Sequence, residues 1–149
     1  MFTTNAYTKD FKYFKEKYAE SMERMFAAVS DLYAEHWNDY FHPALFKDEN
    51  ESWESAFKNT HKQYLEALRI NDARKVLELA CGRGGFTDVL AENTSGEVLG
   101  IDISRSQLSH TNRFKRPNLR FKHHDIMKVD ELREMFDAVL LMDADCYLP

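Results

Sequence analysis

The sequence predicts an α/β fold, in which a parallel sheet of about four strands carries helices on both faces. Three observations lead to this prediction. A chain of 149 residues with 44% hydrophobic residues can form one compact domain with a sizeable core. After Arg74, short apolar runs alternate with segments of helical length, which is typical of βαβ units. Before Arg74, apolar residues recur at helical spacing, so two helices should precede the sheet.

The two N-terminal helices follow from spacing and from capping residues. Large apolar residues between Tyr7 and Leu32 occur in steps of three or four, so they share one helix face, which we interpret as core-forming. Asp48 and Glu51 have the spacing of a capping box, which predicts that a second helix begins there. Its buried side should contain Trp53, Phe57, Tyr64 and Leu68.

The second half should contain four strands joined by helices. The first connecting helix is expected to begin near Phe86 and to end before Asn93. The second should begin at Ser104, because Ser104 and Gln107 again have capping-box spacing. The expected strands are residues 75–80, 97–102, 119–125 and 136–143.

Composition and charge narrow the class of protein. The net charge of −5 argues against a nucleic-acid partner, and no apolar run approaches the roughly 20 residues that a membrane span requires. The N-terminus lacks the pattern of a secretory signal. Cys81 and Cys146 are too few to suggest a disulfide framework or a zinc site. We therefore expect a cytoplasmic protein without a membrane span.

One basic stretch is compatible with a nucleic acid as the acceptor. Residues 113–122 contain five basic side chains that could contact phosphate, but an edge strand that faces solvent would have the same composition. The two histidines that follow, His123 and His124, would point in opposite directions along a strand, so we expect no metal site there.

A glycine-rich turn follows the first expected strand. Gly82, Gly84 and Gly85 would let the backbone approach a ligand closely, with free amides pointing at it. The match to the dinucleotide pattern G-x-G-x-x-G is partial, because Thr87 stands at the position of the third glycine. Glu78, inside the strand, would repel a pyrophosphate and attract an ammonium group. The turn therefore predicts a cationic ligand.

The segment "ELACGRGG" resembles the first motif of the class I S-adenosylmethionine-dependent methyltransferases. The resemblance implies a Rossmann-like parallel sheet in the order 3-2-1-4. It also implies that S-adenosyl-L-methionine is the cofactor and S-adenosyl-L-homocysteine the product. The backbone at Ala80, Cys81, Gly82 and Gly84 would lie against the methionine part of the cofactor, and Glu78 would lie near its amino group.

Three later stretches occur in the order that this family implies. Asp102 ends the second strand, where a carboxylate can accept hydrogen bonds from ribose hydroxyls, and Ile103 would pack on the adenine ring. The resemblance places Asp125 and Ile126 beside the adenine and Met142 beside the cofactor. Each feature alone also fits a tight turn, a helix cap or a solvated acid. Their joint order favours a cofactor site.

The segment "DLYAEHWNDYFHPALF" resembles, more loosely, the region before the cofactor domain in small-molecule methyltransferases of the sterol, tocopherol and phosphoethanolamine type. There, helices before the sheet form a lid on the substrate. Residues 1–72 would then be a lid segment, and 73–149 the N-terminal half of a methyltransferase domain. Tyr33, Trp37 and Tyr40 are predicted to line the substrate site, although packing as ordinary core fits each of them equally well.

Methyl transfer is an in-line displacement, which depends mainly on alignment and exclusion of water. A base is needed only when the acceptor loses a proton. Asp143 and Tyr147 follow the fourth strand, where some related enzymes have a residue that binds or deprotonates the acceptor, and His42 is a third candidate. The acceptor is expected to be a small molecule.

The family's sheet normally has seven strands, whereas this sequence ends just after the expected fourth. We expect a fragment of a longer enzyme. Alternatively, a homodimer or the N-terminal helices would cover the exposed edge of the sheet. Two other functions stay open: a cofactor-binding protein without catalytic activity, and an NAD-dependent oxidoreductase, which would leave Glu78 unexplained.

Overall fold

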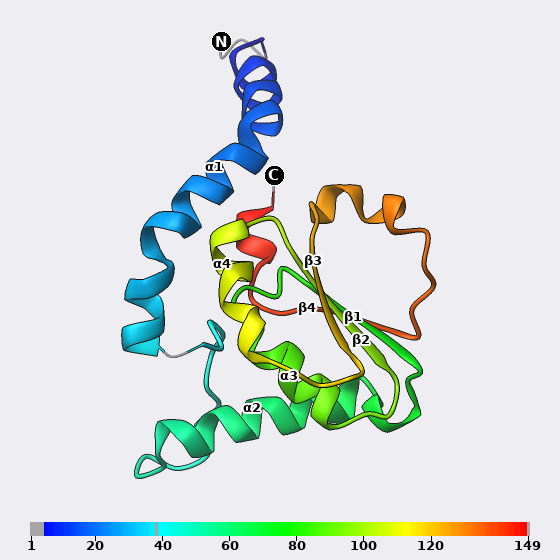
Figure 1. Cartoon of the computed structure of the whole chain (residues 1–149). Coiled ribbons are helices and arrows are strands. Elements are labelled where there is room, and N and C mark those ends of the chain that lie inside the picture. The colour runs from blue at the N-terminus through cyan, green and yellow to red at the C-terminus, as the bar shows by residue number, and fades with distance from the viewer. Residues whose placement is uncertain (1–4, 38, 149) are drawn as a thin grey trace.

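The computed structural model describes residues 5–37 and 39–148, and the side chains of 17–36 and 39–148. Two helices precede a sheet in which strands and helices alternate (Figure 1). Short 3₁₀ helices occupy Ile70–Asp72, His110–Arg113, Ile126–Leu132 and Asp145–Tyr147. The main elements are α1 (Asn5–Trp37), α2 (Trp53–Ala67), β1 (Lys75–Leu79), α3 (Gly85–Glu92), β2 (Glu97–Asp102), α4 (Arg105–Ser109), β3 (Leu119–His123) and β4 (Ala138–Leu141).

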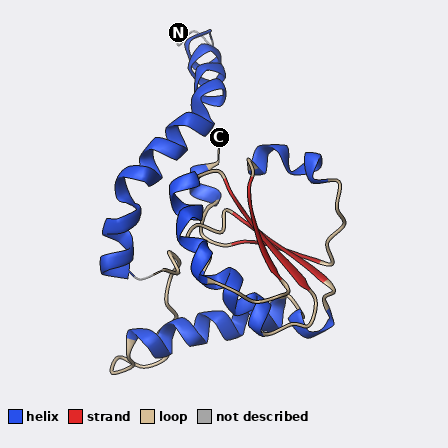
Figure 2. Cartoon of the chain, in the orientation of Figure 1, coloured by secondary structure: helices blue, strands red, loops and turns tan. Residues whose placement is uncertain are grey.

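The strands form one sheet, red in Figure 2. Its order is β3-β2-β1-β4, and all its strand pairs are parallel. Leu77 of β1 pairs in register with Leu99 of β2 and with Val139 of β4. Both Val76 and Leu77 are buried, because neighbouring residues of a central strand face opposite sides of a sheet that is covered on both sides. The predicted α/β class, strand positions and strand order are confirmed.

Two hydrophobic clusters lie on opposite sides of the sheet. On one side, Val76 and Val98 pack with Phe86 and Leu90 of α3, and α2 adds apolar side chains to this cluster. On the other side, Leu77, Leu99 and Ile101 pack with Leu132 of the 3₁₀ segment. These clusters fix the strands, so the loops at their carboxyl ends extend from a rigid base.

The start of α2 differs from the prediction. The N-cap is Ser52, whose hydroxyl accepts a hydrogen bond from the amide of Ser55 at 3.2 Å. The carboxylate of Glu51 instead accepts a hydrogen bond from the amide of Lys47 at 2.7 Å and so closes the turn before the helix. Trp53, the first residue of α2, is 58% exposed and is not among the buried residues of this helix. By contrast, Ser104 caps α4 through the amide of Gln107, as predicted.

The edge strand β3 explains the basic stretch. Arg116 pairs with Asp88 at 2.6 Å, Arg120 lies 3.5 Å from Glu97, and Arg113 forms an ion pair elsewhere in the chain. Neighbouring carboxylates thus partly neutralise this surface, which favours the interpretation as a charged sheet edge.

Among the described residues, no helix is both long and apolar enough to cross a bilayer.

Candidate functional site

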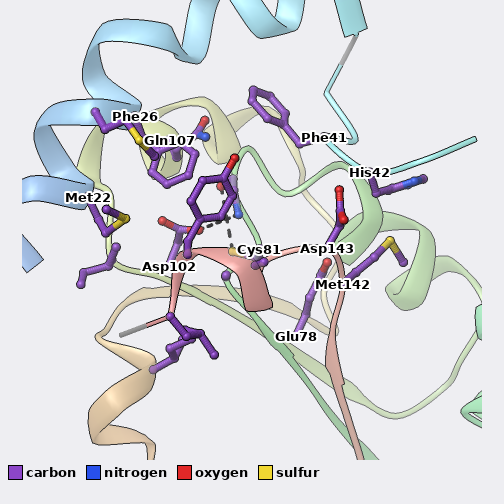
Figure 3. Close-up of a pocket in the computed structure, with 18 of the residues that line it drawn as sticks. Met22, Phe26, Phe41, His42, Glu78, Cys81, Asp102, Gln107, Met142 and Asp143 are labelled. Carbon is purple, nitrogen blue, oxygen red and sulfur yellow. Dashed lines mark hydrogen bonds between the residues drawn. The ribbon is translucent and has the colours of Figure 1, made fainter. Parts of the chain in front are cut away.

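A cavity of about 440 Å³ lies between the carboxyl ends of the strands and α1 (Figure 3). Every predicted cofactor residue except Gly84 lines it, together with Tyr33, Tyr40 and all three predicted catalytic residues. The side chain of Trp37 lies outside the described residues. The cavity has the position at which parallel α/β sheets bind ligands, and its volume is in the usual range of small-molecule sites, about 300–1,000 Å³.

Glu78 is the most unusual group of the cavity. It is 5% exposed, and its Oε2 atom makes no hydrogen bond to the described residues. Burial raises the pKa of this carboxyl to about 8. An unpartnered carboxylate oxygen in a buried site strongly favours a cationic partner. The residue present therefore fits an ammonium group, and the contact itself stays a prediction.

Asp102 is fixed by the backbone. Its Oδ2 atom accepts a hydrogen bond from the amide of Gly82 at 2.8 Å, and its Oδ1 atom accepts one from the amide of Ser104 at 2.7 Å. Burial raises the pKa of this carboxyl, and the two amide bonds act in the opposite direction. Each carboxylate oxygen can still accept a further hydrogen bond, so Asp102 can both hold the turn before α4 and bind hydroxyl groups in the cavity.

The three glycines of the turn have different neighbours. A Cβ atom on Gly82 would meet nothing closer than 3.9 Å, so this glycine borders the open cavity. A Cβ on Gly84 would lie 2.7 Å from the ring of Phe121, and one on Gly85 would lie 2.7 Å from the carbonyl oxygen of Asp39. Gly84 thus packs against Phe121 of β3 and is not among the residues that line the cavity, and its contact with the cofactor stays a prediction.

Three non-glycine residues with left-handed backbone line the cavity. They are Phe41, Ala80 and Asp143, with φ values of 54°, 54° and 53°. Such conformations cost energy in a residue with a side chain, and they often occur where structure holds a functional loop in place. These three positions lie after α1, β1 and β4, respectively.

The apolar side of the cavity comes mainly from α1, which sequence reasoning assigned to ordinary core. Met22, Met25, Phe26 and Val29 all line the cavity. Figure 3 shows Met22 and Phe26 across the cavity from His42 and Asp143. The periodic stripe was the available signal, but helical periodicity alone does not distinguish a core face from a pocket face.

The aromatic residues after α1 complete this wall. The rings of Tyr33 and Phe41 are stacked, with their centroids 5.2 Å apart. The rings of Tyr147, beyond β4, and Phe26 pack edge to face, with their centroids 5.4 Å apart. The acidic residues thus lie at the strand ends, whereas Met22, Met25 and most of the aromatic side chains lie on the side of α1.

His42 has both ring nitrogens engaged. Its Nδ1 atom is 2.9 Å from the carbonyl oxygen of Pro43 and must donate to it, and its Nε2 atom is 3.0 Å from Nε2 of His61. Burial lowers the pKa of both imidazoles, that of His61 to about 4. In the neutral pair His61 donates and His42 accepts. His42 therefore forms a wall of the cavity without offering a free nitrogen to it.

No group of three metal-ligating side chains occurs among the residues with described side chains. The Nε2 atom of His123 contacts the carbonyl oxygen of Ile103, and that of His124 contacts the carbonyl oxygen of Lys128. The two described cysteines are both free thiols, with Cys81 buried at the cavity and Cys146 exposed.

Comparisons with known proteins agree with this geometry. Residues 76–149 match the family model described as a methyltransferase domain. This match covers just under half of the chain, and the chain has the sheet order that the resemblance to the class I S-adenosylmethionine-dependent methyltransferases implied. S-adenosylmethionine is the cofactor that this family uses.

Individual relatives cover most of this chain but less of their own length. The sterol 24-C-methyltransferase of Kluyveromyces lactis is 27% identical over 140 residues, which cover 90% of this chain and 37% of that protein. The chain thus spans little more than a third of that curated relative. The structure of coclaurine N-methyltransferase bound to N-methylheliamine and SAH is 26% identical with a TM-score of 0.59, over 68% of this chain and 31% of that one. The [4+2]-cyclase SpnF shares the fold, with a TM-score of 0.64 at 18% identity over 73% of this chain and 43% of that one.

Proposed function

We propose that this protein transfers a methyl group from S-adenosylmethionine to an apolar small molecule, with a sterol as the first acceptor to test. The observation that supports this most is the two-sided cavity, which has buried acids at the strand ends and an apolar wall on α1. The sterol methyltransferase relative supports the choice of acceptor.

The strand ends supply groups suited to each part of the cofactor. Glu78 would pair with the ammonium group, and Asp102, held by two amides, would accept hydrogen bonds from the ribose hydroxyls. Asp125 would bind the adenine amino group, with Ile103 and Ile126 against the ring faces. S-adenosylmethionine, when bound, supplies an electrophilic methyl group on a sulfonium centre.

The residues of the opposite wall would orient the acceptor and exclude water from it. Met22, Phe26 and Tyr33 offer apolar surface for a hydrocarbon skeleton. Asp143 is the best candidate to accept a proton from the acceptor, because its carboxylate is at the cavity after β4. Tyr147 is second, and His42, whose nitrogens are engaged, is third.

Several further features belong to the same proposal. Residues 1–72 would act as the lid segment and 73–149 as the cofactor-binding unit. The protein would be cytoplasmic, and a homodimer could cover the edge strand β4, where Val139 is 52% exposed. The ion-paired edge at β3 and the net charge of −5 make a nucleic-acid acceptor the less favoured alternative.

Calorimetric titration of the protein with S-adenosylmethionine, S-adenosylhomocysteine and NAD tests the cofactor. We expect binding of the first two and weaker binding in Glu78→Gln. Glu97→Gln, an exposed acid at the start of β2, is the matched control and should bind as the unchanged protein does. Binding of NAD alone would instead indicate an oxidoreductase.

Methyl transfer is then measured with radiolabelled cofactor and a panel of sterols and polar amines, with extraction into an organic phase. Label in the sterol fraction supports the proposal. Label only in polar products would contradict the apolar acceptor. Cofactor binding without transfer to any acceptor would favour a non-catalytic binding protein.

A further inference from the structure

Arg83 is a buried cation in the middle of the glycine-rich turn. It lies between Gly82 and Gly84, and it is 8% exposed. A guanidinium is rarely buried unless its N–H groups are paired, because the loss of hydration is costly. Its position at the second residue of the Gly-x-Gly pattern places it directly beside the cofactor side of the cavity, which Gly82 lines.

The guanidinium bonds mainly to the end of α1 and to the segment after it. Its Nε atom donates to Oδ1 of Asp39 at 2.9 Å. Its Nη1 atom donates to Oγ of Ser30 at 3.1 Å and to Oδ1 of Asp31 at 3.0 Å. Its Nη2 atom donates to Nδ1 of His110 at 3.0 Å. One side chain of the cofactor turn therefore holds several groups of the lid segment.

These contacts extend to the cavity and to residues next to its aromatic wall. The hydroxyl of Ser30 donates to Oε1 of Gln107 at 2.8 Å, and Gln107 lines the cavity. Tyr33 lies one helical turn after Ser30, and Tyr40 follows Asp39 directly, so both cavity-lining aromatics are placed next to partners of Arg83. The aromatic wall is thereby connected to the cofactor turn through hydrogen bonds.

We propose that Arg83 is a positioning residue that couples the cofactor turn to the lid, so that the acceptor wall forms correctly only when this turn is in its ligand-binding arrangement. The inference rests on the proposed function, because it assumes that the cofactor binds at Gly82. Loss of Arg83 should therefore weaken acceptor binding more than cofactor binding.

Lysine cannot replace arginine in this role. Arginine has five N–H donors in a rigid plane and can reach the lid and His110 together, whereas lysine has three donors on one nitrogen. Arg113 offers a matched control, because it binds Oδ2 of the same Asp39 at 2.9 Å but is outside the turn and its side chain is 41% exposed.

Amide hydrogen exchange of residues 18–36, with and without S-adenosylhomocysteine, tests the coupling without an activity assay. In the unchanged protein the ligand should slow this exchange. In Arg83→Gln and Arg83→Lys the exchange should be at least about tenfold faster and should no longer respond to the ligand. Calorimetry should give an affinity for S-adenosylhomocysteine within about threefold of the unchanged protein, and Arg113→Gln should behave as unchanged.

A steady-state assay adds a second readout, since Arg83→Gln should raise KM for the acceptor more than it lowers kcat. If Arg83→Gln does not fold, Asp39→Ala removes the lid-segment carboxylate that Arg83 binds and should give the same increase in exchange. Unchanged exchange in these variants, or an equal loss of cofactor and acceptor affinity, would overturn the inference. If the unchanged protein fails to bind S-adenosylhomocysteine, the proposed function is refuted. The contacts of Arg83 with the lid segment are then still tested by comparing the exchange rates of the variants without ligand.

Discussion

Binding of S-adenosylhomocysteine near neutral pH should release a proton from Glu78. Burial raises the pKa of this carboxyl to about 8, so roughly 90% of it is protonated at pH 7 in the free protein. An ammonium group against Oε2 favours the charged carboxylate and lowers its pKa. The complex should therefore contain the ion pair, and the proton should pass to the buffer.

The magnitude follows from the pKa shift. A return from about 8 to the usual 4.5 corresponds to about 5 kcal/mol of interaction as an upper limit. Between pH 6 and 7.5 the affinity should rise about tenfold per pH unit, because each binding event must first remove one proton. In the free protein, the raised pKa means that the folded state binds more protons than the unfolded state. Its free energy of unfolding should thus fall as the pH rises from about 4.5 to about 8.

Calorimetry at pH 7 in two buffers of different ionisation enthalpy measures the proton directly. The observed enthalpies should indicate about 0.9 proton released per ligand bound. Glu78→Gln has no carboxylate to ionise, so it should release none, bind more weakly and lose the pH dependence of stability. A pH-independent affinity with no proton released would refute this account of the cofactor site.

Two further predictions concern stability. Gly84→Ala should lower the free energy of unfolding by about 3 kcal/mol, because φ is +81° and the new Cβ would lie 2.7 Å from Phe121, whereas Gly82→Ala should cost only about 1 kcal/mol. Urea unfolding without ligand compares the two, and equal losses would contradict the packing role of Gly84. Burial lowers the pKa of His61 to about 4, whereas its value in the unfolded chain is 6.5. Between these values the unfolded state binds the proton more readily. The stability from this group is therefore complete above pH 6.5 and is lost as the pH falls through about 4. The loss should reach up to about 3 kcal/mol and be absent in His61→Gln; a variant with the same pH profile as the unchanged protein would exclude His61 as its source.

The sheet could be predicted from the sequence because each strand is a short apolar run with a local boundary. Lys75–Leu79 and Glu97–Asp102 are buried on both sides, so they read as continuous apolar segments, and turn residues mark their ends. The acids at the strand ends were predictable for the same reason. Parallel strands bring their carboxyl ends to one edge, so Asp102 and Asp125 meet at one cavity.

The lid could be predicted only in part, because its contacts join residues far apart in the chain. The apolar stripe of α1 has the same periodicity whether it faces core or cavity, and only the tertiary structure distinguishes the two. The start of α2 was misplaced for a related reason. Asp48 and Ser52 are both acceptable caps by residue type, and local spacing does not distinguish them; the helix begins after Ser52.

The glycine-rich turn is a junction between the cofactor side, the edge strand and the lid. Gly82 borders the cavity, Gly84 makes room for Phe121, and Gly85 makes room for the backbone carbonyl of Asp39, whose carboxylate accepts a hydrogen bond from Arg83. Close packing within the chain therefore accounts for two of the three glycines. Gly84 lets β3 pack against the turn, and Gly85 lets the lid segment do so. Arg83 adds hydrogen bonds between the turn and the lid segment. A change of backbone conformation at this turn would consequently reach the acceptor wall, whereas a change in the outer face of α1, such as at the exposed Leu32, would not reach the cofactor.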